Sequence, residues 1–258
     1  MPKYIHMNKD NIIDKLREIF GKSVQQLNIL EEKIDIGLQM EYFEQTKELR
    51  KEADSEQILQ ESDCIFHENT SNDEIKKYLV LLAGLSEVKA LRKIEEYKQS
   101  APDELKDWVV LAHHESKMNI ESVLLDKNLI YISTGLGGKE GKLRYFIVLS
   151  SKNKNAFTTS QESIIEKELR FTLGKHAADL ENISFQEFYA AIVALVPLHV
   201  AMRPVFKEAI EECNQLGNFL NENYLVTNVK IFNNDEILSL LNKDDSDAPE
   251  QEFDIKEI

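Results

Sequence analysis

The pattern of hydrophobic and polar positions changes character once along the chain. Up to about residue 124 apolar side chains recur at helical spacing, and beyond it helical and strand-like patterns alternate. The change falls in residues 124–151, LLDKNLIYISTGLGGKEGKLRYFIVLSS. Two β-branched and aromatic runs, 129–134 and 143–149, flank a glycine-rich segment there, which is the composition of a long β-hairpin. We therefore expect this hairpin to join an all-helical first half to a mixed second half.

Helical spacing in the first half predicts helices over residues 8–20, 23–51, 56–66 and 87–99. Gly21 is a suitable stop for the first of them. The second carries Leu27, Leu30, Ile34 and Leu38 through a very polar background, and so few apolar positions do not establish a coiled coil.

A nine-residue pattern occurs twice in this half. Residues 73–81 read DEIKKYLVL and residues 103–111 read DELKDWVVL. Ser71 with Glu74 forms a capping box before the first copy, and Pro102 precedes the second. Tyr78 and Trp108 hold equivalent places, and we expect both in the core.

A period near thirty residues, made of short antiparallel helices, resembles a HEAT-like α-solenoid of the short-repeat kind. The resemblance covers residues 56–116. It implies a scaffold whose exposed face binds another macromolecule or supports a neighbouring domain, and it assigns no functional residue.

The second half predicts helices over 161–178, 204–221 and 235–241 and a strand over 224–232. Residues 183–200 suit a buried strand pair or a helix, and we favour strands. The resulting order implies a sheet covered by helices and an α+β fold class. We expect a helical repeat-like domain over 1–118, an α+β domain over 119–242 and an acidic tail over 243–258. The tail is expected to be disordered, although its EFDIKEI could add a strand to the sheet.

Composition limits the function classes. The formal net charge of −15, from 46 acidic and 31 basic side chains, argues against a nucleic-acid partner. The loose basic cluster Lys139, Lys142, Arg144, Lys152 and Lys154 is better explained as a solvated hairpin tip, with nucleic-acid binding as a weaker alternative. No apolar segment spans a membrane and no secretory signal is recognisable, and the two distant cysteines fit a reducing compartment, so we expect a cytoplasmic protein.

The glycine-rich GLGGKEGK invites comparison with a phosphate-binding loop. Walker A requires a glycine at position 136, where the chain has leucine, and a hydroxyl residue at position 143, where it again has leucine. A strand follows instead of a helix. We interpret the segment as a flexible hairpin tip.

Histidines and cysteines give no strong site. His113, His114 and Glu115 offer a weak zinc alternative, but adjacent histidines point about 100° apart on a helix. His176 stands near a helix end and is interpreted as structural. Cys213 lies among acidic residues, which disfavour a thiolate. We expect no metal and no cofactor.

The sequence therefore favours a non-enzymatic protein-interaction module, an adaptor or regulator, with a protein partner and an undetermined oligomeric state. The alternative is a hydrolase or small-ligand-binding enzyme with a pocket between the two halves. The candidate ligand-binding residues for that pocket are Ser133, Thr134, Arg144, His199 and Arg203.

Overall fold

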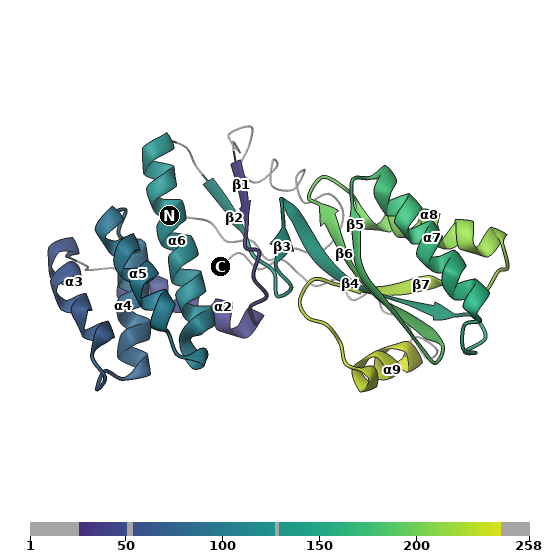
Figure 1. Cartoon of the computed structure of the whole chain (residues 1–258), viewed down its shortest axis with the longest axis horizontal. Helices are drawn as coiled ribbons and strands as arrows, with labels where there is room; N and C mark the ends of the chain where they lie inside the picture. The colour runs from purple at the N-terminus through teal and green to yellow at the C-terminus, as the bar shows by residue number, and fades with distance from the viewer. Residues whose placement is uncertain (1–25, 51–53, 127–128, 244–258) are drawn as a thin grey trace. The chain divides into compact units, whose positions relative to one another are not determined.

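The computed structural model describes residues 26–50, 54–126 and 129–243, which form two compact units (Figure 1). The helical unit comprises residues 34–129, and the sheet unit comprises residues 1–33 and 130–258. This architecture confirms the α+β fold class. The helix predicted over 8–20 and the acidic tail beyond Lys243 lie outside the described residues.

The helical unit is built around its longest helix, α6, which contacts α2, α4 and α5. Its elements are α2 (Ile36–Leu49), α3 (Ser55–Glu61), η2 (Ser62–Phe66), α4 (Asn72–Gly84), α5 (Val88–Ser100), η3 (Asp103–Leu105) and α6 (Lys106–Leu125). Ser71 caps α4 by accepting a hydrogen bond from the Glu74 amide, as the sequence predicts. The predicted boundary between residues 118 and 119 falls inside α6.

The two nine-residue copies do not place their aromatic residues alike. Trp108 is fully buried, stacks edge-on against Tyr42 and donates its indole N–H to the Lys76 carbonyl. Tyr78 is only half-buried, and its hydroxyl donates to Glu61. The expected equivalence of these two residues is therefore wrong, and the HEAT-like resemblance stays a prediction.

The helix predicted over 23–51 is wrong in its first part. Residues Gln26–Ile29 form strand β1, which pairs with β2 (Leu129–Ile132), and α2 begins only at Ile36. The Asp35 carboxylate accepts a hydrogen bond from the Leu38 amide and so starts the helix at that point.

The sheet unit contains a larger antiparallel sheet of strand order β7–β4–β6–β5. Its elements are β3 (Gly138–Lys139), β4 (Lys142–Ser151), α7 (Thr159–Lys175), β5 (Asp179–Gln186), β6 (Tyr189–Pro197), α8 (Met202–Gln215), β7 (Leu220–Thr227) and α9 (Asn234–Lys243). The sequence β4-α7-β5-β6-α8-β7 is the βαββαβ arrangement of ferredoxin-like folds.

Helices lie on both faces of this sheet (Figure 1). On one face α7 and α8 pack against Ile147 and Leu149 of β4 and against Ile192 and Val196 of β6. On the other face α9 contributes Ile237 to a smaller cluster with Phe146 and Val148. Helices therefore cover the sheet as the sequence predicts, and the amphipathic α9 covers part of the second face.

The long hairpin expected over 129–149 does not form. β2 pairs with β1, and β4 pairs with the short β3 through Gly138 opposite Leu143. The glycine-rich segment is buried at residues 135–138, where the Leu136 amide donates to the Asn228 carbonyl. It is therefore a packed crossing of chain segments, and residues 139–141 form an exposed tip.

The strands favoured over 183–200 are confirmed as parts of β5 and β6. The helix and strand that follow are displaced, since α8 ends at Gln215 and β7 begins at Leu220. Asn214 explains this, because its side chain bonds both the amide and the carbonyl of Leu220 and turns the chain into the strand. In the described part of the chain, no helix has the length and apolar character needed to cross a membrane.

Candidate functional site

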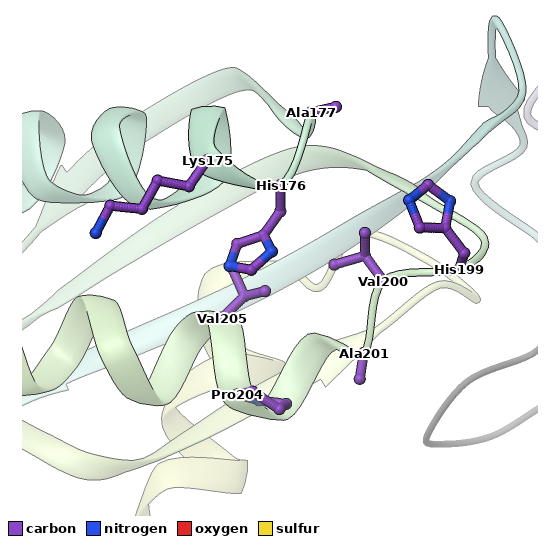
Figure 2. A pocket seen from close by; sticks show the side chains of 8 residues that line it. All are labelled: Lys175, His176, Ala177, His199, Val200, Ala201, Pro204 and Val205. Atoms are coloured by element: carbon purple, nitrogen blue, oxygen red, sulfur yellow. The ribbon is translucent and has the colours of Figure 1, made fainter.

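A pocket opens in the sheet unit where the end of α7, the end of β6 and the start of α8 meet (Figure 2). Its volume is about 480 Å³, and its lining residues are Lys175, His176, Ala177, His199, Val200, Ala201, Pro204 and Val205. The β5–β6 hairpin brings the two histidines to one place. Since Asp179 of β5 pairs with Leu195 of β6, the chain returns to the end of α7 just before His199.

Glu208 of α8 lies beside the basic groups from α7. The Nζ atom of Lys175 lies 2.7 Å from one carboxylate oxygen of Glu208, and Nε2 of His176 lies 3.9 Å from the other. The hydrogen bond from Lys175 holds the pKa of Glu208 below its ordinary value. In Figure 2 the Lys175 ammonium points away from the space between the histidines. A ligand in the pocket would therefore compete with Glu208 for these two groups.

Two further basic groups near the pocket have no such partner. His199 and Arg203 are both exposed, and neither makes a hydrogen bond or ion pair to any part of the chain that the structure describes. Their donors are directed to solvent in the absence of a ligand. They are the groups here that can bind an anion without first breaking an internal contact.

The N-terminus of α8 adds to the positive character of the pocket. Its cap residue is Ala201, which has no side chain able to bond the first amides, and the first turn has no acidic residue. The partial positive charge of these amides is therefore not neutralised locally. The pocket thus combines two imidazoles and a helix N-terminus, with the Lys175 ammonium at its edge beside Glu208, and these groups favour an anionic ligand.

The candidate residues chosen from the sequence do not converge on one site. Arg144 donates to the Glu181 carboxylate and, at 2.7 Å, to the Leu136 carbonyl, which raises the pKa of Arg144 and lowers that of Glu181. Thr134 donates to the Gly137 carbonyl at 3.3 Å. These contacts hold the glycine-rich crossing in place.

Of the five candidates only His199 lines the pocket, and Arg203 lies in the same turn as its lining residues. The lining residues do not include Ser133, Thr134 or Arg144, and Ser133 is half-buried. The pocket that the structure shows at His199 is lined by residues of the sheet unit.

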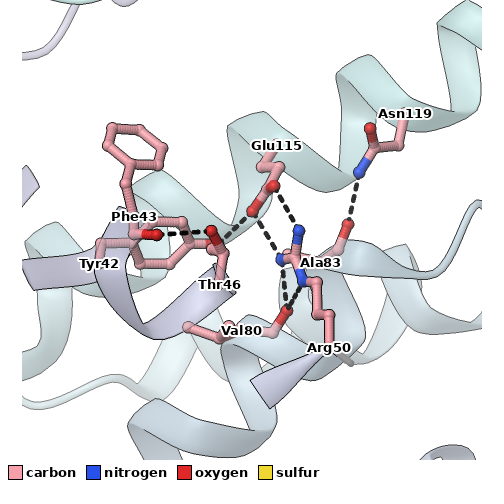
Figure 3. A network of polar contacts seen from close by, with 8 residues as sticks. All are labelled: Tyr42, Phe43, Thr46, Arg50, Val80, Ala83, Glu115 and Asn119. Carbon is pink, nitrogen blue, oxygen red and sulfur yellow. Dashed lines mark hydrogen bonds and ion pairs between the residues drawn. The ribbon is translucent and has the colours of Figure 1, made fainter. Parts of the chain in front are cut away.

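The zinc alternative at His113, His114 and Glu115 is not supported. The Glu115 carboxylate accepts hydrogen bonds from Tyr42 at 2.7 Å and from Arg50 at 2.6 and 2.8 Å (Figure 3). His113 faces Glu95 instead, and burial lowers its pKa. Within the described residues, no group of three metal-binding side chains occurs.

Lys175 and His176 were missed as site residues because each occurs singly at a helix end. A signal was nevertheless present in the sequence. A helix followed by two strands of equal length returns the chain to the end of that helix, so a polar residue after the second strand lies near the helix C-terminus. His176 and His199 are separated by one such strand pair.

The net charge is unevenly distributed along the chain. Residues 130–243 carry 12 basic and 13 acidic side chains, a formal charge of −1, whereas residues 34–129 carry 12 basic and 21 acidic side chains, a formal charge of −9. The charge of the whole chain therefore does not describe the surface around the pocket, because electrostatic repulsion is screened over about 8–10 Å.

Comparison with known proteins yields distant structural likenesses only. No family model and no curated protein matches the sequence. A solved structure described as a transposase from Deinococcus radiodurans R1 is 14% identical over 41% of this chain and 93% of that chain, with a TM-score of 0.36. A REP-associated tyrosine transposase bound to a REP hairpin is 9% identical over 41% of this chain and 68% of that chain, with a TM-score of 0.31. Likeness at this level does not transfer an activity.

These neighbours nonetheless contradict the sequence-based account of function. Both are described as transposases and one as bound to a REP hairpin, which runs against the expectations of a non-enzymatic protein-binding adaptor and of an unlikely nucleic-acid partner, and we do not keep these expectations. The enzyme alternative with a pocket between the halves does not fit either. The physical error was to apply the charge of −15 to every surface, although residues 130–243, which include the pocket, carry a formal charge of only −1.

Proposed function

We propose that the sheet unit binds nucleic acid and that its pocket receives a backbone phosphate. The observation that carries this proposal is that His176 and His199 line one pocket together with Lys175. An imidazole can donate a hydrogen bond to a phosphate oxygen in either protonation state, and an ammonium group adds a full positive charge. Contacts to phosphate supply most of the affinity in protein–nucleic acid complexes.

The surrounding charges support a phosphate over a carboxylate-bearing peptide. Arg203 and His199 are exposed and have no internal partner in the described chain, so several donors from different elements can reach one tetrahedral anion. Residues 130–243 are nearly neutral, so they do not repel a polyanion. The helical unit, with its charge of −9, would repel one.

Binding is tested with fluorescein-labelled 20-nucleotide single strands and duplexes, followed by fluorescence anisotropy at 50 and 200 mM salt. We expect salt-sensitive binding by the full chain, and we expect His176→Ala combined with His199→Ala to weaken it at least tenfold. His67→Ala, a change in the helical unit, is the matched control and should leave the affinity unchanged. Absence of salt-sensitive binding, or equal affinity of the double variant, contradicts the proposal.

A further inference from the structure

Phe171 on α7 is an exposed aromatic ring close to the pocket. Its exposed fraction is 61%, among the larger values for apolar side chains in the described chain. The Nζ atom of Lys175, which lines the pocket, lies 4.3 Å from the centre of the Phe171 ring. A single exposed apolar side chain on a protein surface is ordinary. Phe171 differs because Lys175, which lies over its ring, also lines the pocket.

The spacing of the two features suits a strand of nucleotides. Phe171 and His176 are five residues apart, which is about 7.5 Å along a helix axis. Two nucleotides stacked at about 3.4 Å each cover a similar length. A base could therefore lie on the ring while a phosphate of the same strand lies in the pocket.

We infer that the ligand is a single strand, with one base stacked on Phe171 and a nearby phosphate held by His176 and His199. This inference rests on the proposed function. Stacking on a protein ring needs a base whose face is open, and the bases inside a duplex are already stacked on one another. The Lys175 ammonium, placed over the ring, is positioned to contact the sugar–phosphate backbone beside that base.

Both acidic and basic side chains lie around Phe171 and the pocket. Glu208 holds Lys175, and Arg170 is paired with Glu166 one turn earlier on α7. Lys167 and Glu168 precede the ring in sequence. The binding energy is therefore expected to come from stacking on Phe171 and from phosphate contacts in the pocket, and the phosphate contacts make it dependent on salt.

The test is Phe171→Ala, titrated with the single-stranded 20-mer and, separately, with inorganic phosphate detected by NMR at the imidazoles of His176 and His199. We expect the affinity for the single strand to fall about 5- to 150-fold while the affinity for phosphate is unchanged. Phe171→Trp should retain strand binding. Leu216→Ala, which removes an apolar side chain of 62% exposure from the end of α8, is the control and should have no effect.

The outcomes separate this inference from the proposed function. If wild type binds the single strand through the histidines and Phe171→Ala binds it equally well, stacking is refuted and phosphate binding stands. Duplex binding as tight as single-strand binding also refutes the inference. If wild type binds neither the strand nor phosphate, the proposed function itself fails.

Discussion

Gly135 packs so closely against Val229 that a Cβ atom on the glycine would overlap the Val229 carbonyl oxygen. The neighbouring Gly137 has a φ of +64° and would meet the carbonyl oxygens of Glu31 and Glu32 in the same way. These glycines allow three chain segments to cross with their backbones in contact. The glycine-rich sequence therefore has a packing role and not a phosphate-binding one.

Gly135→Ala is expected to destabilise the sheet unit by about 3 kcal/mol, because the backbone must shift to admit the methyl group. The buried Cys213 reports on this unit, since burial raises the pKa of its thiol to about 12 and protects it until the unit opens. The measurement is the rate of thiol labelling in a Cys64→Ala background. Gly174→Ala in α7 has open space for a methyl group and should gain about 0.5–1 kcal/mol. Equal labelling rates for the two variants would contradict this account.

The buried carboxylate of Glu115 depends on Arg50 (Figure 3). Arg50 also donates to the Val80 carbonyl, and a Cβ at Gly84 would lie 2.5 Å from its Nε atom, so the guanidinium fits a space that the glycine leaves open. Arg50→Met should destabilise the helical unit by about 3–5 kcal/mol by leaving a buried charge without its main partner.

Unfolding of that unit can be followed in urea through Trp108, the only tryptophan of the chain. Arg92→Met, which breaks the exposed pair with Glu95, is the control and should change stability by less than about 0.5 kcal/mol. Adding Glu115→Leu to Arg50→Met should restore part of the lost stability. If the double variant is less stable than Arg50→Met alone, the unpaired Glu115 carboxylate is not the cause of the lost stability.

Acid should weaken the contact between Arg144 and Glu181. The hydrogen bond from Arg144 lowers the pKa of Glu181 below its ordinary 4.5, so the ionised form stabilises the folded state. This contribution is complete above pH 4.5 and is lost as the pH falls through the lower folded-state pKa. The free energy of unfolding of the wild type should exceed that of Glu181→Gln by about 1 kcal/mol at pH 7, and the two values should converge as the pH falls below the folded-state pKa of Glu181. Urea unfolding followed by circular dichroism at each pH measures both stabilities, and a gap that widens in acid would refute the assignment.

Glu208 should limit the affinity of the pocket, since it holds Lys175 and lies near His176. Glu208→Gln removes its charge and should strengthen single-strand binding about two- to fivefold. The anisotropy titration measures this change at 50 mM salt. Glu211→Gln, one turn further along α8, is the matched control. Weaker binding by Glu208→Gln would mean that the carboxylate itself contacts the ligand.

Local signals in the sequence predicted several elements correctly. Ser71 caps α4 as expected, and the strands favoured over residues 183–200 form parts of β5 and β6. The start of β7 was predicted too late in the chain. The two hydrogen bonds between the Asn214 side chain and the backbone of Leu220 begin the strand earlier, and such bonds depend on tertiary geometry.

Features that depend on residues far apart in the sequence could not be predicted from local patterns. The strand at residues 129–132 looked like half of a hairpin, but its partner is β1, about a hundred residues earlier in the chain. The pocket was missed for the same reason, since His176 and His199 each look structural until the register of β5 and β6 places them together.

The proposed function is tested most directly by the imidazole NMR signals of the full chain during titration with the single-stranded 20-mer. The chain has six histidines, and the assignments follow from single substitutions. The account predicts that the signals of His176 and His199 move together and saturate, while those of His67 and His113 stay in place. Binding that leaves His176 and His199 unmoved would contradict it.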